Sequence, residues 1–179
     1  MGGMMGGLGD GYSLIGMLLN LVITIAVIGG LVWLESRAAF AAHVRALAAR
    51  LPDAAYAVNL CEDRYRFLVA FCAAAVRGQT NLLPPTRTRA AIDEVRARYP
   101  GSYCIGDGEA CGCDALLAGP GAHFVHLEAT LPALEGAPLR VDESAVVAIG
   151  FTSGSTGMPT ANAKTLASLR TSTAQNHAA

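Results

Sequence analysis

The sequence predicts an α/β domain with a mostly parallel sheet and crossover helices, preceded by one transmembrane helix. Helical and strand-like segments alternate along residues 35–179, which favours parallel strands joined by helices. The uninterrupted apolar run "SAVVAIGFT" (144–152) is typical of a strand that is buried on both faces of a sheet. The run from Leu14 to Leu34 carries no charged side chain. These three observations define the predicted architecture.

The N-terminal region predicts a membrane anchor. At about 1.5 Å per residue, Leu14–Leu34 spans roughly the 30 Å of a bilayer's hydrocarbon layer. A buried core helix would show a polar face, which this run lacks. A secretory signal would have a basic residue before the run, and none is present. Arginines follow the run and only Asp10 precedes it, so we expect a single-pass protein of the inner (cytoplasmic) membrane with its C-terminal domain in the cytoplasm. The glycine-rich start, residues 1–13, is expected to be flexible.

The first soluble elements follow from hydrophobic spacing. Apolar residues recur at helical intervals between Phe40 and Leu51, which predicts an amphipathic helix that ends before Pro52. "YAVNL" (56–60) alternates larger and smaller side chains as a strand does. Asp63 then suits the positive end of a following helix, which Gly78 is placed to end.

The next elements are shorter and end at prolines. "TNLL" (80–83) predicts a strand that runs into Pro84. Apolar residues between Ile92 and Tyr99 predict one more helix. The stretch from Gly106 to Ser144 is less regular, and its apolar pieces "HFVHL" and "APLRV" are either weak edge strands or part of a surface excursion.

Charge excludes one class of partner. The formal net charge is −1, and no dense cluster of Lys and Arg occurs. Proteins that bind nucleic acid carry a basic patch that neutralises phosphates. We therefore expect no nucleic-acid partner.

The segment after the apolar run at 144–152 has the chemistry of a phosphate-binding loop. Gly154 and Gly157 allow the backbone to approach an anion closely. Hydroxyl groups alternate with them, at Thr152, Ser153, Ser155 and Thr156. Backbone and hydroxyl donors of this kind can wrap a polyphosphate, although composition alone also allows a flexible Ser/Gly linker. The spacing does not fit the P-loop of NTPases, and no Gly-x-Ser-x-Gly elbow is present that would make a serine a nucleophile.

The order of residues in "FTSGSTGMP" (151–159) closely resembles the phosphate-binding motif of the adenylate-forming superfamily, which includes AMP-binding acyl-CoA synthetases, aryl-acid ligases and adenylation domains. The resemblance extends over residues 34–179. Within the superfamily, the chain is similar to a bacterial branch of ligases associated with aryl-polyene pathways. It implies a partial N-terminal subdomain of the ligase fold. It also implies that ATP is bound by Thr152, Ser153, Gly154, Ser155, Thr156, Gly157 and Lys164.

The same resemblance implies a reaction. ATP, with Mg²⁺, would activate a carboxylic, fatty or aryl acid to an acyl-adenylate, which then forms a thioester with CoA or a carrier protein. Most members have Lys directly after the proline of the motif, where this chain has Thr160, so Lys164 is the candidate for that charge. The family's adenine, ribose, Mg²⁺ and catalytic-lysine motifs lie beyond this region. A fragment that is inactive alone is therefore expected, no catalytic residue is assigned, and the acyl substrate stays open.

Two further possibilities belong to other function classes. The chain could be a membrane-anchored nucleotide or phosphate binder without catalysis, or a membrane protein whose soluble part only mediates interactions. Cys104, Cys111 and Cys113, with His123 and His126, are residue types that bind zinc, but their spacing matches no common zinc pattern. No metal ligand is therefore predicted.

Overall fold

The computed structural model describes residues 10–108, 124–152 and 160–177. The chain divides into two compact units, Met1–Ala39 and Phe40–Ala179. Helix α1 (Asp10–Ala48) provides the described part of the first unit and the first turns of the second. All sheet strands belong to the second unit, which carries the candidate sites.

The prediction of a transmembrane helix at Leu14–Leu34 is wrong. Within residues 10–108, 124–152 and 160–177, no helix combines the length and apolar character that a membrane crossing requires. The apolar run is not a separate element, because α1 continues without a break through Glu35 and Arg37 to Ala48. The count of apolar residues between Leu14 and Leu34 could not show that the helix extends beyond them to Ala48. The predicted location in the cytoplasmic membrane and the predicted membrane partner are overturned with it.

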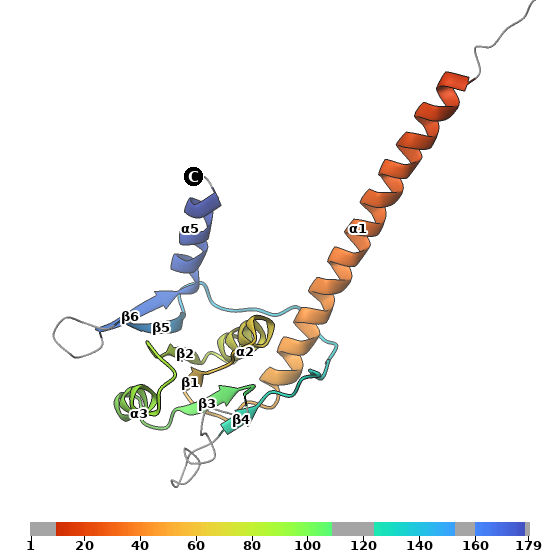
Figure 1. Cartoon of the computed structure of the whole chain (residues 1–179). Helices are drawn as coiled ribbons and strands as arrows, with labels where there is room; N and C mark the ends of the chain where they lie inside the picture. Colours follow the sequence, from red (N-terminus) through yellow and green to blue (C-terminus); the bar gives the residue numbers. More distant parts are fainter. Residues whose placement is uncertain (1–9, 109–123, 153–159, 178–179) are drawn as a thin grey trace, which may run out of the picture. The chain divides into compact units, whose positions relative to one another are not determined.

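The second unit is built on a six-stranded sheet with the order β4-β3-β1-β2-β5-β6 (Figure 1). Its strands are β1 (Tyr56–Asn59), β2 (Thr80–Leu83), β3 (Tyr103–Gly106), β4 (Phe124–His126), β5 (Val146–Thr152) and β6 (Thr160–Thr165). All neighbouring strands are parallel except β5 and β6, which pair antiparallel. The predicted α/β class with a mostly parallel sheet is therefore confirmed.

Helices cover both faces of this sheet, as Figure 1 shows for α2 (Arg64–Val76) and α3 (Arg89–Arg98). One apolar cluster joins the end of α1 and α2 to Ala57 and Ile105. The other joins α3 to Val58 and Leu82. Because side chains alternate between the two faces of a strand, neighbours such as Ala57 and Val58 enter different clusters. The central strands are buried from both sides, which explains their near-continuous apolar sequence.

A side-chain cap explains where α2 begins. The carboxylate of Asp63 accepts a hydrogen bond from the backbone N–H of Arg66 at 2.8 Å. An aspartate in this position satisfies one of the N–H groups that have no partner within the first turn of a helix. The role that the sequence predicted for Asp63 at the start of this helix is confirmed. Gly78 follows the helix with φ +71°, a conformation that favours glycine.

Two polar side chains of β2 connect it to β5. The hydroxyl of Thr80 donates to the carbonyl oxygen of Val146 at 2.8 Å. The Asn81 amide nitrogen donates to the carbonyl oxygens of Val147 and Phe71, each at 3.1 Å. Asn81 is fully buried, so these bonds offset part of the cost of placing an amide inside the domain. The partners on β5 lie 66 residues away along the chain.

Several elements differ from the sequence prediction. β3, β6 and helix α5 (Leu166–His177) were not predicted. "HFVHL" does contain a strand, β4, at the edge of the sheet, whereas "APLRV" contains none. β6 is an exposed, polar edge strand, so it lacks the apolar pattern from which strands are predicted.

Candidate functional site

The strand pair β5–β6 brings two of the predicted phosphate-binding residues onto one face of the sheet. Thr152 ends β5 and lies opposite Thr160, the first residue of β6. Lys164, near the end of β6, lies opposite Ala148. Residues two apart in a strand share a face, so Ala148, Thr152 and Lys164 are on the same side of the sheet. The antiparallel pairing therefore places Lys164 of β6 beside β5, the preceding strand in the chain.

This face of β5 and β6 forms one side of a pocket with a volume of about 520 Å³. Its apolar walls come from α2, from the end of β2 and from α5. The lining residues are Phe71, Leu83, Pro84, Pro85, Ala148, Gly150, Phe151, Thr152, Asn162, Lys164 and Leu169. A mostly apolar hollow with a few polar groups is the usual composition of a site for a small molecule. Thr152, Asn162 and Lys164 supply a hydroxyl, an amide and an ammonium group.

Lys164 is the only lysine in the sequence. Its side chain is exposed, and within the part of the chain that the structure describes it forms no ion pair. Among the described residues that line the pocket, none carries a carboxylate. The ammonium group is therefore available to an anionic ligand, and an ammonium group is a common phosphate contact in proteins.

The rest of the predicted phosphate-binding set lies outside the described residues. These are Ser153, Gly154, Ser155, Thr156 and Gly157. Their assignment stays a prediction. What the structure adds is the position of the two strand ends, Thr152 and Thr160, between which they lie in the sequence.

The structure also bears on whether the described residues could bind a metal ion. Among the described residues, no group of three or more His, Cys, Asp or Glu side chains could hold a metal ion. The pocket beside Lys164 offers phosphate donors but no carboxylate for Mg²⁺, so its described residues do not fit that ion. Cys104 is buried in β3, while Cys111, Cys113 and His123 lie outside the described residues. The prediction on zinc therefore stays untested.

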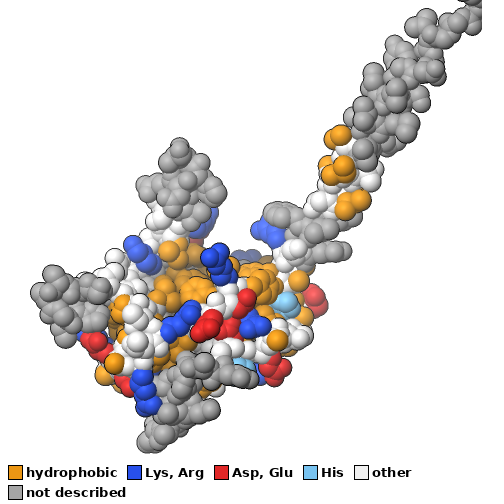
Figure 2. All heavy atoms as spheres, viewed as in Figure 1, with side chains coloured by type: hydrophobic (Ala, Val, Ile, Leu, Met, Phe, Trp, Pro, Cys, Tyr) orange, Lys and Arg blue, Asp and Glu red, His pale blue; other side chains and the backbone are white. Residues whose placement is uncertain are grey.

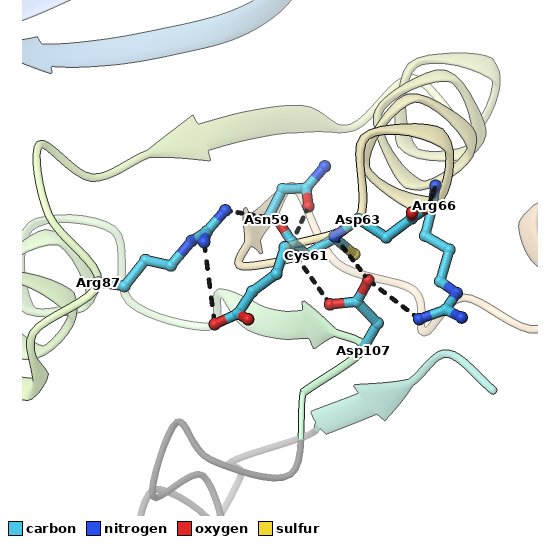
Figure 3. Close-up of polar contacts among 7 residues, drawn as sticks. Asn59, Cys61, Asp63, Arg66, Arg87 and Asp107 are labelled. Atoms are coloured by element: carbon cyan, nitrogen blue, oxygen red, sulfur yellow. Dashed lines mark hydrogen bonds and ion pairs between the residues drawn. The ribbon is translucent and has the colours of Figure 1, made fainter. Parts of the chain in front are cut away.

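A second polar cluster lies at the carboxyl ends of β1 and β3, and Asp107 is its centre (Figure 3). Its carboxylate accepts hydrogen bonds from the backbone N–H groups of Glu62 at 2.7 Å and Asp63 at 3.0 Å. Arg66 donates a third at 3.3 Å. The Asp107 side chain is only 2% exposed. Burial alone would raise the pKa of this carboxyl, but the three donors and the Arg66 charge together hold that pKa below its usual value.

Arg87 bridges the neighbouring part of this cluster. Its guanidinium donates to the carbonyl oxygen of Cys61 at 2.6 Å and lies 3.9 Å from the carboxylate of Glu62. The Asn59 amide nitrogen donates to the carbonyl oxygen of Phe67 and its oxygen accepts from the Cys61 N–H, so β1 is joined to α2. Burial raises the pKa of the Cys61 thiol to about 12, so it stays neutral at physiological pH.

Sequence reasoning missed Asp107. Its partners on the β1 side lie 44 and 45 residues earlier in the chain, and the pairing of β1 with β3 brings them together. The available signal was an acidic residue directly after the short apolar stretch "YCIG". Polar residues at the carboxyl end of a parallel strand are candidates for a site, but this strand itself was not predicted.

Comparison with known sequences identifies no relative. The chain matches no protein-family profile and no curated protein. Its similarity to known proteins is therefore one of fold.

Solved structures do match. They include McyG A-PCP complexed with phenylalanyl-adenylate (TM-score 0.55, 18% identity, 77% of this chain and 25% of that one). A second is a Mycobacterium tuberculosis fatty acyl CoA synthetase (TM-score 0.55, 17% identity, 72% of this chain and 28% of that one). A third is o-succinylbenzoate CoA synthetase (MenE) from Bacillus subtilis in complex with AMP (TM-score 0.56, 18% identity, 78% of this chain and 37% of that one). This chain spans about a quarter to a third of their length. The resemblance predicted from "FTSGSTGMP" is thus confirmed at the level of the fold, which is that of the N-terminal part of adenylate-forming ligases.

Proposed function

We propose that this chain supplies the phosphate-contacting part of an ATP-dependent ligase that converts a carboxylic acid to an acyl-adenylate. The observation that carries the proposal is the convergence of Thr152 and Lys164 on one pocket at the β5–β6 pair. The motif that runs on from Thr152 is the one that the sequence shares with these ligases. The fold supports the same reading, because the similar solved structures include complexes with AMP and with an acyl-adenylate.

The chemistry asked of these residues is charge neutralisation and positioning. A carboxylate oxygen of the acid attacks the α-phosphorus of ATP, the bond from that phosphorus to the bridging oxygen breaks, and pyrophosphate leaves with the electron pair. Negative charge grows on the departing oxygens as the bond breaks. The Lys164 ammonium and the Thr152 hydroxyl would hold the β- and γ-phosphates, so that this charge forms next to fixed donors.

The role of the remaining loop residues belongs to the same proposal. Ser153, Gly154, Ser155, Thr156 and Gly157 would add backbone and hydroxyl donors around the phosphates. Mg²⁺, CoA and a carrier protein are expected from the resemblance alone. The acid itself is not specified by the described residues.

The test uses the fact that Lys164 is the only lysine. An amine-reactive acylating reagent can modify only this side chain and the N-terminal amine, so mass spectrometry reports the rate at Lys164 with the N-terminus as the internal reference. ATP and pyrophosphate should slow acylation of Lys164, whereas adenosine should not. Thr152→Val should weaken the protection by ATP, because it removes a donor and keeps the shape. Acylation of Lys164 at the same rate with and without ATP would refute the proposal.

A second measurement tests whether this chain alone catalyses the reaction. Pyrophosphate release is followed with ATP, Mg²⁺ and a panel of aryl and fatty acids. Release that depends on both the acid and Lys164 supports the ligase over a nucleotide or phosphate binder and contradicts the expectation that the fragment is inactive alone. Protection of Lys164 without release for any acid is expected both of an inactive ligase fragment and of a binder.

A further inference from the structure

The strand order marks a crevice beside β1, which β2 separates from the β5–β6 pair. From β1 the chain continues to β2 on one side, while β3 lies on the other side of β1. The following helix α2 and the helix α3 that leads to β3 pack on opposite faces. In open α/β sheets, ligands bind outside the carboxyl ends of the strands where the strand order reverses in this way. Here that place is the end of β1 beside β3.

A pocket of about 310 Å³ lies at this place. It is lined by Cys61, Glu62, Arg64, Phe67, Leu68 and Arg87. The volume is at the lower end of the range for small-molecule sites, which suits a ligand with a single ring. Figure 2 shows acidic and basic side chains side by side among apolar ones on the viewed face of this unit.

The apolar part of the lining is unusually exposed for its size. Leu68 is 51% exposed although it lies in the first turns of α2, and Phe67 beside it is half-buried. Burial of apolar surface is worth roughly 25 cal/mol per Å². A ligand with an aromatic or branched aliphatic body would gain stability by covering these two side chains.

The charged part of the lining selects an anion of one charge. Arg64 and Arg87 contribute two positive charges and Glu62 one negative charge, so the lining has a net charge of +1. Arg64 forms no ion pair among the residues that the structure describes. A guanidinium binds carboxylates and phosphates through paired hydrogen bonds. One carboxylate neutralises the net charge of +1, whereas a phosphate dianion would leave an excess negative charge beside the Glu62 carboxylate and costs more to remove from water.

The start of α2 does not itself provide the anion site. The N–H groups of Glu62 and Asp63 already donate to Asp107, and the N–H of Arg66 donates to Asp63. A ligand therefore depends on the arginine side chains and the apolar surface. We propose that this crevice binds a small organic monocarboxylate, whose carboxylate pairs with Arg64 and Arg87 and whose aromatic or branched body covers Phe67 and Leu68.

The crevice and the pocket at Lys164 have no lining residue in common, so substitutions can separate them. Benzoate is titrated into the full chain and followed by NMR chemical-shift changes. Arg64→Gln should raise the Kd roughly tenfold, since it removes a charged hydrogen-bond donor. Arg140→Gln is the matched control, because Arg140 is exposed and does not line the crevice. It should leave the Kd unchanged, as should Lys164→Gln.

Two further arms test the apolar surface and the charge of the ligand. Leu68→Glu should abolish binding, and since Leu68 is already half exposed, the free energy of unfolding should change little. Benzyl alcohol, which lacks the charge, and phenyl phosphate, which has two charges, should both bind more weakly than benzoate. The proposal is overturned if benzoate does not bind, if Lys164→Gln rather than Arg64→Gln weakens it, or if phenyl phosphate binds more tightly.

Discussion

Two parts of the sheet, the β1–β3 pair and the β5–β6 pair, use polar groups in opposite ways. Beside β1 and β3, the protein's own Asp107 accepts two backbone N–H groups and Arg66 while remaining almost fully buried. Beside β5 and β6, Lys164 and Thr152 line a pocket whose described residues include no carboxylate. The arrangement around Asp107 satisfies these donors internally and stabilises the fold. The pocket at the β5–β6 pair leaves its donors for a ligand, so Asp107 contributes stability where Lys164 contributes binding capacity.

Removing the internal acceptor should produce the largest effect. Asp107→Ala leaves two N–H groups and the Arg66 charge without their acceptor, and loss of one partner of a buried charged pair costs about 3 kcal/mol. We expect the free energy of unfolding in urea to fall by about this amount. Asp142→Ala is the control, because the Asp142 side chain is exposed and accepts hydrogen bonds from the adjacent turn residue Ser144. Equal losses for the two variants would mean that Asp107 contributes no more than a surface turn.

Lowering the pH should remove the contribution of the Asp107 charge to stability without changing the volume of the side chain. Because the folded pKa of Asp107 is depressed, its stabilisation is fully present above the pKa of the unfolded chain, about 3.9. It is lost as the pH falls from there through the lower folded pKa. We therefore expect the difference in unfolding free energy between the wild type and Asp107→Asn to be constant near pH 6 and to shrink below about pH 4. A difference that stays constant down to pH 2 would contradict the depressed pKa.

Filling the open pocket should have the smallest effect on stability and a clear effect on binding. A Cβ built on Gly150 would meet no atom within 4 Å, and Gly150 lines the pocket beside Lys164. Valine suits a strand better than glycine, so Gly150→Val should raise the free energy of unfolding by at most about 0.5 kcal/mol. The protection of Lys164 by ATP should fall, because the side chain occupies the pocket.

Gly106→Val is the comparison for this substitution. A Cβ on Gly106 would lie 3.0 Å from the ring of Phe124 and 3.7 Å from Leu60, so the ring would have to move. This variant should be less stable than Gly150→Val and should leave the protection of Lys164 unchanged. Undiminished protection in Gly150→Val would mean that ATP does not use this pocket.

The elements that the sequence predicted well are those with a strong local pattern. "TNLL" corresponds to β2, the run at 144–152 contains β5, and Asp63 caps α2. Each depends on residues that are close along the chain: alternation, an apolar run of strand length, or a cap before a helical face. β3 has only four residues between a serine and an aspartate, so its local signal is weak.

The parts that were missed depend on pairing between distant segments. β6 consists of polar, mostly exposed residues, and it is a strand because β5 lies beside it. Asp107 has a role only after β1 and β3 have paired. For the site, the motif predicted Lys164 and Thr152 as partners, but their meeting in one pocket required the register of the β5–β6 pair. The membrane prediction failed for the opposite reason, because it used a local pattern without the full length of α1.

The bonds between β2 and β5 also bear on the order of folding. Closing a long loop costs entropy before any contact is gained, and pairings of high sequence separation slow folding. Because Thr80 and Asn81 reach partners 66 residues later, we expect β5 to dock onto β2 after the closer pair β1 and β2 has formed. During synthesis, β1 to β4 leave the ribosome before β5, so one edge of β2 stays open in that interval. We expect newly made chains to be most prone to aggregation at that stage, when a chaperone would have this edge to protect.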